Sequence, residues 1–195
     1  MKRLIACVLV TLAWLSAETI NNGERDRAMS YLHSSRKLFL DSTADLSPAQ
    51  WSFKPGPDRW SIAEVAEHVA LTEDFLFGYT QKLLQGPAEA KTVTFKDEEV
   101  LKNMVDRSKK AQAPEPVRPT RKWTNPRDAL AHFKSSRDKI IEYAEKTQDD
   151  LRHHYAVMGP NTMDAYQMLL MIAGHSERHT AQINEVKASP DYPKK

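Results

Sequence analysis

The sequence is poor in the residues that characterise disulfide-rich and all-β proteins. Among 195 residues it has one cysteine, Cys7, and six glycines, and only 8% of its residues are aromatic. A single cysteine cannot form an intramolecular disulfide. Few glycines and aromatics, with no run of alternating β-branched residues, disfavour an all-β fold. No internal repeat stands out, and the length, with 41% hydrophobic and 28% charged residues, indicates one globular domain.

The first 17 residues differ from the rest of the chain. A positively charged pair is followed by an apolar run over residues 4–15 and then by two small residues. This order is typical of a secretory signal peptide, and the run is short for a membrane span. We therefore expect residues 1–17 to direct export to the periplasm or the extracellular space, and residues 18–195 to form a single domain. Because Leu15 occupies a position where a small residue is usual, an uncleaved N-terminal anchor is the alternative.

Removal of the signal peptide would change the chemistry open to the mature chain. Cys7 would be lost, which leaves neither a disulfide nor a thiol nucleophile. The formal net charge would fall from +2 to 0, because the removed segment carries two basic residues and no acidic one. A neutral net charge gives no support for nucleic-acid binding, which requires a concentrated basic surface. We expect no nucleic-acid partner, and no stable membrane span once the signal is cleaved.

Apolar residues recur at helical spacing in four long segments. Helices are predicted over residues 24–44, from Ser61 to the turn at Gln85-Gly-Pro87, over 124–146 and over 162–188. Turns and a loop are expected between the first two. The long connection between the second and third helices contains a shorter amphipathic helix at residues 96–110 and a proline-rich extended stretch. The sequence therefore predicts an all-α, four-helix bundle with one long crossover connection that contains a short extra helix. Core positions predicted around the first helix are Ala28, Tyr31, Leu32, Leu38, Phe39 and Leu46.

Two histidines four residues apart, His175 and His179, lie in the last predicted helix where its apolar stripe continues. Side chains at i and i+4 project from one face of a helix, so both imidazoles can bind one metal ion. A third histidine, His68, lies on or beside the inward face of the second predicted helix. Three imidazoles leave a coordination position open, as in reactive rather than structural metal sites. The alternative is that all three are core residues hydrogen-bonded to backbone carbonyls.

Three segments together resemble the DinB-like superfamily across essentially the whole mature chain. They are Leu-Ser-Pro-Ala-Gln-Trp at 46–51, Trp-Ser-Ile-Ala-Glu-Val-Ala-Glu-His at 60–68, and the pattern His175-x3-His179-x2-Gln182. The resemblance implies a four-helix bundle that binds one divalent metal through three histidines. Matched position by position, the ligands are His68, His175 and His179. Characterised relatives include thiol transferases and an isomerase that use bacillithiol or mycothiol, and many others are regarded as metal-dependent hydrolases.

A three-histidine site suits Zn, Ni, Fe or Mn, and the sequence does not choose among them. The open position can hold a water whose pKa the cation lowers, or an incoming thiolate. We predict a metal-dependent hydrolase or transferase that acts on a small molecule. Low-molecular-weight thiols belong mainly to the reducing cytoplasm, so export counts against a thiol-dependent S-transferase. A bundle that binds a metal or a partner without turnover is the other alternative, and a homodimer formed through an apolar helix face is a further possibility.

No catalytic acid or base stands out beyond the histidines. Glu64 lies one turn before the histidine of the second helix, where it can approach the ligand sphere, but a capping box with the preceding serine already explains it. Glu67 and Glu177 adjoin ligands in sequence, and since neighbouring residues point about 100° apart around a helix, both are expected in solvent or at most behind the ligands. Gln182 can hydrogen-bond a ligand or substrate, or make an interhelical contact. Trp60 is expected to pack at the start of its helix. Surface positions are predicted for the remaining histidines, His33, His132, His153 and His154.

Overall fold

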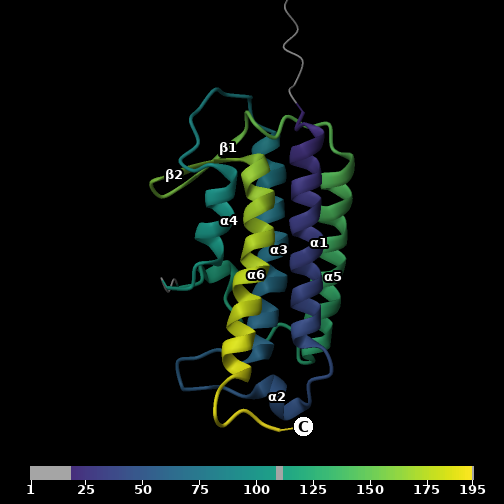
Figure 1. Ribbon diagram of the computed structural model, residues 1–195, viewed down its shortest axis with the longest axis vertical. Helices are drawn as coiled ribbons and strands as arrows, with labels where there is room; N and C mark the ends of the chain where they lie inside the picture. Colours follow the sequence, from purple (N-terminus) through teal and green to yellow (C-terminus); the bar gives the residue numbers. More distant parts are fainter. Residues whose placement is uncertain (1–18, 109–111, 195) are drawn as a thin grey trace, which may run out of the picture.

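Long helices form the body of the molecule, which the computed structural model describes over residues 19–108 and 112–194 (Figure 1). Within these residues four helices exceed twenty residues: α1 (Asn22–Thr43), α3 (Ile62–Leu84), α5 (Pro126–Lys146) and α6 (Ala165–Lys187). Both α1 and α3 pack against α5 and against α6, so α1 and α3 lie diagonally opposite each other. The predicted all-α four-helix bundle is confirmed.

The predicted signal peptide at 1–17 lies outside the described residues. Across the part of the chain that is described, none of the helices combines the length and the apolar character needed to cross a bilayer.

Local sequence signals fix where each long helix begins. Asn21 and Ser61 cap α1 and α3, and in both cases a glutamate three residues later completes a capping box. Helix α5 begins with Pro126 at its first position, where the missing N–H costs no intrahelical hydrogen bond. Asp164 caps α6 by accepting a hydrogen bond from the backbone N–H of Gln167.

The crossover between α3 and α5 contains α4 (Asp97–Val105) and the short 3-10 helix η1 (Glu115–Val117). Helix α4 packs along α6 on the outside of the bundle (Figure 1). The predicted extra helix is present, but it ends at Val105 and not near residue 110. The side chain of Asp106 accepts a hydrogen bond from the N–H of Ser108, which diverts that donor from the helical ladder.

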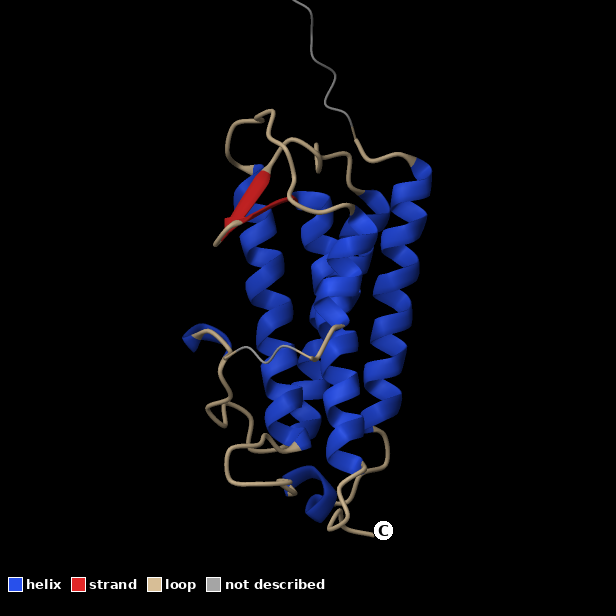
Figure 2. Ribbon diagram, turned by 60° about the vertical axis from the view of Figure 1, so that its left-hand side comes forward, coloured by secondary structure: helices blue, strands red, loops and turns tan. Residues whose placement is uncertain are grey.

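Three small features were not predicted, and one of them is η1, which lies in the proline-rich stretch that was expected to be extended. The segment after Ser47 forms a five-residue helix, α2 (Pro48–Ser52), where turns were expected. Before α6 an antiparallel hairpin pairs β1 (Tyr155–Met158) with β2 (Asn161–Asp164), as Figure 2 shows in red. The hairpin turns at Gly159, whose φ of +63° suits glycine. The last helix therefore begins at Ala165 and not at residue 162.

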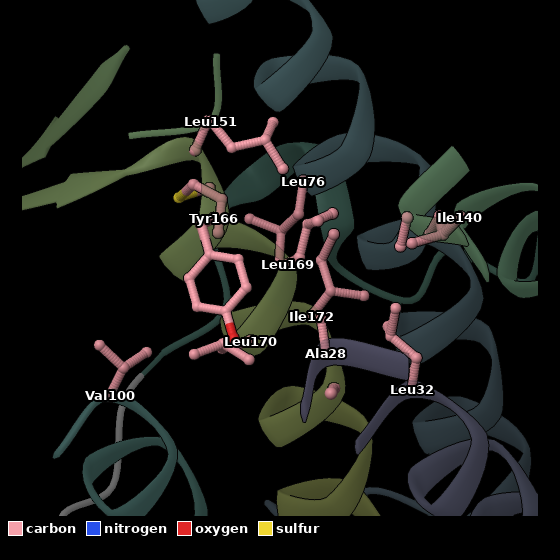
Figure 3. Close-up of a cluster of buried hydrophobic side chains, with 14 of the residues drawn as sticks. Ala28, Leu32, Leu76, Val100, Ile140, Leu151, Tyr166, Leu169, Leu170 and Ile172 are labelled. Carbon is pink, nitrogen blue, oxygen red and sulfur yellow. The ribbon is translucent and has the colours of Figure 1, made fainter. Parts of the chain in front are cut away.

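The buried face of α1 follows a stripe that includes serines as well as apolar residues. Ala28, Leu32 and Phe39 are fully buried, as predicted, and Leu46 beyond the helix is buried as well. Figure 3 shows the first two beside Leu76, Ile140 and Ile172 from the other helices. Tyr31 and Leu38 were also predicted to be buried, but they are 37% and 46% exposed. Ser35 and Ser42 occupy the corresponding buried positions of the helix instead.

A single buried arginine joins all four long helices. Arg137 on α5 is fully buried and donates from Nε and Nη2 to the two carboxylate oxygens of Glu73 on α3, at 2.7 and 2.6 Å. Its Nη1 donates to the carbonyl of Leu32 and the hydroxyl of Ser35 on α1, and its Nη2 donates to the hydroxyl of Ser176 on α6. All five guanidinium protons thus face acceptors in the core.

Candidate metal centre

The bundle brings the three predicted histidines together. His68 comes from α3, while His175 and His179 come from successive turns of α6. One ring nitrogen from each lies within 4.8 Å of the others, and these residues are the one such potential metal-binding group found among the described residues. The ring centroids are separated by 4.4 to 5.0 Å. The i, i+4 spacing on one helix and a single facing histidine are sufficient to produce this convergence.

The geometry around His68 directs one lone pair toward the centre of the group. Its Nδ1 lies 2.7 Å from the carbonyl oxygen of Val117 in η1, and because a carbonyl only accepts, Nδ1 carries the proton. The Nε2 atom is therefore unprotonated in the neutral ring. It lies 3.1 Å from Nε2 of His175. Two nitrogens bound to one ion at about 2.0–2.1 Å are separated by roughly 3.0–3.4 Å, so this spacing fits a shared cation.

His179 has the matching arrangement on its outer side. Its Nδ1 lies 2.8 Å from Oε1 of Gln182, one turn further along α6. The contact with a histidine that the sequence suggested for Gln182 is therefore present. A partner on the outer nitrogen of a ligating imidazole is the usual way to fix its tautomer and ring orientation.

Burial keeps the three imidazoles neutral. It lowers the pKa of His68, against the opposing effect of the Val117 hydrogen bond. For His175 and His179, burial lowers the pKa well below its usual value, and the neighbouring imidazoles lower it further. Metal binding requires neutral imidazole, so the site is held in the protonation state that a cation needs.

A sequence model of the DinB superfamily matches residues 31–183. The chain belongs to the DinB superfamily. Its fold is similar to that of YfiT from Bacillus subtilis, described as a probable metal-dependent hydrolase with an unusual four-helix bundle topology, with a TM-score of 0.60. The match covers 87% of this DinB chain and 89% of YfiT at 13% sequence identity, so it is a likeness of fold. No curated protein gives a significant match.

The two glutamates beside His68 have structural roles in this DinB protein. Glu64 completes the capping box of α3 and pairs with Lys54 at 2.7 Å. Burial raises its pKa, but the hydrogen bonds from Lys54 and Ser61 outweigh burial and lower it. Glu67 was expected in solvent or behind the ligands, and the first expectation was wrong. It is buried, and its carboxylate accepts the backbone N–H groups of three consecutive residues, 120–122. Neither carboxylate is available as a general base.

The aromatic residue before α3 lies closer to the site than the sequence indicated. Trp60 packs against the core at the start of its helix, as expected, but its ring also lies 5.0 Å from the ring of His68. Of the other histidines, His33 is exposed, as predicted. The other three are half-buried and have partners: His132 contacts Asp74, His153 contacts Asp150 and His154 contacts the carbonyl of Leu83.

Acid should destabilise the metal-free protein through these histidines. In the unfolded chain their pKa is about 6.5, and burial depresses it in the folded state. Between the two values the unfolded chain binds more protons, so the free energy of unfolding rises with pH. This contribution is complete above about pH 6.5 and falls as pH drops below it, by up to about 1.4 kcal/mol per pH unit for each histidine. Urea unfolding in chelator across pH 5–8 measures the slope.

The control is a matched pair of variants. His175→Gln/His179→Gln should flatten the pH dependence between pH 5 and 6.5, whereas His33→Gln, at an exposed position, should leave it unchanged. Equal slopes in wild type and the double variant would contradict the assignment.

Proposed function

We propose that this DinB-superfamily protein binds one divalent transition metal through His68, His175 and His179 and hydrolyses a small-molecule substrate. The observation that carries the proposal is the convergence of three ring nitrogens within 4.8 Å. Two of the outer nitrogens have acceptors, the carbonyl of Val117 and the side-chain oxygen of Gln182. This donor set suits a cation, because the outer acceptors leave Nε2 of His68 and Nε2 of His179 unprotonated and free to bind it.

The three imidazole donors limit which metals the site can bind and which chemistry such a metal can supply. Imidazole ligands suit Zn, Ni, Fe or Mn. A divalent cation held by three protein ligands acts as a Lewis acid and activates a water molecule as a nucleophile. The chain itself orients two of the three rings through the hydrogen bonds on their outer nitrogens. It also excludes water from the site, because His68 and His179 are only 4% and 7% exposed. His175 is half-buried, and we infer that a substrate approaches the group from its side.

Export forms part of the proposal. It rests on the charged start, the apolar run and the small residues of segment 1–17. A location outside the reducing cytoplasm favours hydrolysis over a transfer reaction that consumes a low-molecular-weight thiol.

Elemental analysis of the purified protein tests the metal site first. We expect about one equivalent of a transition metal in the wild type and in His33→Ala, and less than about a tenth of an equivalent in the variant with all three site histidines replaced by alanine. Full metal content in that triple variant would refute the site.

Substrate screening then tests the reaction class. The metal-loaded protein is assayed against ester, amide and thiol-transfer substrates, with the triple variant as the blank. Turnover of an ester or amide that the variant lacks supports a hydrolase. Turnover only with a thiol present supports the transferase. Absence of turnover with every substrate class supports a protein that binds a metal without catalysis.

A further inference from the structure

A residue of the crossover reaches the outer side of the histidine group. Arg107 lies two residues beyond the end of α4, and its Nη1 donates to Oε1 of Gln182 at 3.3 Å. Its Nε and Nη2 donate to the two carboxylate oxygens of Glu185 at 2.7 and 2.8 Å. Glu185 also pairs with Arg59 at 3.4 Å. The guanidinium is thus held in place by a bidentate contact while one further N–H points at the glutamine.

The chemistry of these groups allows only one orientation of the glutamine amide. A guanidinium can donate hydrogen bonds but cannot accept them, so the Gln182 atom that faces Arg107 must be the oxygen. That same oxygen lies 2.8 Å from Nδ1 of His179. It can only accept there too, so Nδ1 must carry the proton and Nε2 the lone pair.

We propose that Arg107 is a positioning residue: it holds the Gln182 amide with its oxygen toward His179, and so fixes the tautomer in which Nε2 of His179 is free to bind a metal. The tautomer assignment stands on the hydrogen bonds alone. Its consequence for metal affinity rests on the proposed function.

Comparison with His68 shows why such a residue is needed. The outer nitrogen of His68 faces a backbone carbonyl, which cannot exchange its acceptor for a donor. A glutamine side chain can, because rotation by half a turn replaces its oxygen with an NH2 group. The rotated amide would donate to Nδ1 and move the ring proton to Nε2, the position that a metal requires. Arg107 disfavours that rotation, because the Gln182 NH2 group would then face an N–H group of Arg107, and both groups are donors.

The contact also joins distant parts of the chain. Arg107 and Gln182 are 75 residues apart in sequence. Val117, the partner of His68, belongs to the same crossover. The crossover therefore supplies the outer hydrogen bond of one histidine directly and controls that of another through Gln182.

The test measures the ring proton of His179 by 15N NMR in the metal-free protein at pH 7.5. We expect the Nδ1–H form to predominate in the wild type and both tautomers to be populated in Arg107→Met. The double variant Arg107→Met/Gln182→Glu should restore the Nδ1–H form, because a carboxylate offers only oxygen in either orientation. Arg107→Lys should retain the wild-type tautomer, since an ammonium group also only donates. Arg59→Met, which removes another cation that pairs with Glu185, should have no effect.

Two outcomes would overturn the proposal. One is a single Nδ1–H form in Arg107→Met, and the other is a mixture in the double variant that matches the mixture in Arg107→Met. Gln182→Met removes the glutamine that links Arg107 to His179, and it should also give a mixture of both tautomers. The experiment therefore does not depend on the folding of a single variant. Zinc titration adds a second readout: affinity should fall about 10-fold in Arg107→Met and recover in the double variant. Failure of all proteins to bind any of Zn, Ni, Fe and Mn would refute the proposed function but leave the tautomer result standing.

Discussion

Replacing Arg137 with alanine is expected to lower the free energy of unfolding by about 3–5 kcal/mol. The side chain is fully buried and neutralises Glu73, which is only 1% exposed. Removing the cation leaves a carboxylate in the core without its charged partner and leaves the Ser176 and Ser35 hydroxyls each short of a hydrogen bond. Because a typical domain is stable by only about 5–15 kcal/mol, this loss would remove a large share of the total.

Urea unfolding of matched variants separates the charge from the packing. Lys139→Ala changes an exposed residue of the same helix and should stay within about 0.5 kcal/mol of the wild type. The double variant Arg137→Met/Glu73→Leu should recover most of the loss, since a buried ion pair can often be replaced by apolar residues of similar volume. A cost below about 1 kcal/mol for Arg137→Ala would show that the network contributes little to stability.

Metal loading is expected to stabilise the folded protein by about 2.7 kcal/mol at a free metal concentration of 100 times Kd, and by about 4.1 kcal/mol at 1,000 times Kd. The ligands come from α3 and α6, which are brought together only by folding, so the unfolded chain has no equivalent site. The gain is measured by unfolding the protein with added metal and with chelator. His68→Ala should abolish the gain, whereas His33→Ala should keep it. Identical unfolding curves for wild type with each metal and with chelator would contradict the prediction.

Local sequence was sufficient to predict the bundle, and it suggested the convergence of the histidines, for which the family resemblance was the stronger argument. Helical spacing and the capping box at Ser61 locate α3, and the i, i+4 spacing places His175 and His179 on one face of α6. No comparable pattern along the chain indicates the hairpin. Its strands are four residues each, with Val157 and Met158 exposed, so there is no long alternating pattern to detect.

The interactions that support the site were beyond local prediction for a different reason. The carboxylate of Glu67 accepts hydrogen bonds from backbone N–H groups more than fifty residues away in the sequence, and Arg137 contacts Glu73 from 64 residues away. Periodicity along the chain reports which face of a helix is buried, but not which polar groups meet across the core. In a sequence, a buried arginine on a predicted helix face looks the same as an exposed one. The position of Gln182 was recognised because it lies on the same helix as its partner.

The division of the ligands between α3 and α6 also determines when the metal can enter. His68 and His175 are 107 residues apart, so a growing chain has no site until synthesis has passed His179 in α6. Under the proposed function, metal binding would therefore be a late event, after synthesis of both histidine-bearing helices and docking of α6 onto α3. If the chain is exported as proposed, the free metal concentrations in the compartment where folding finishes, rather than those around the ribosome, would decide which ion the protein carries.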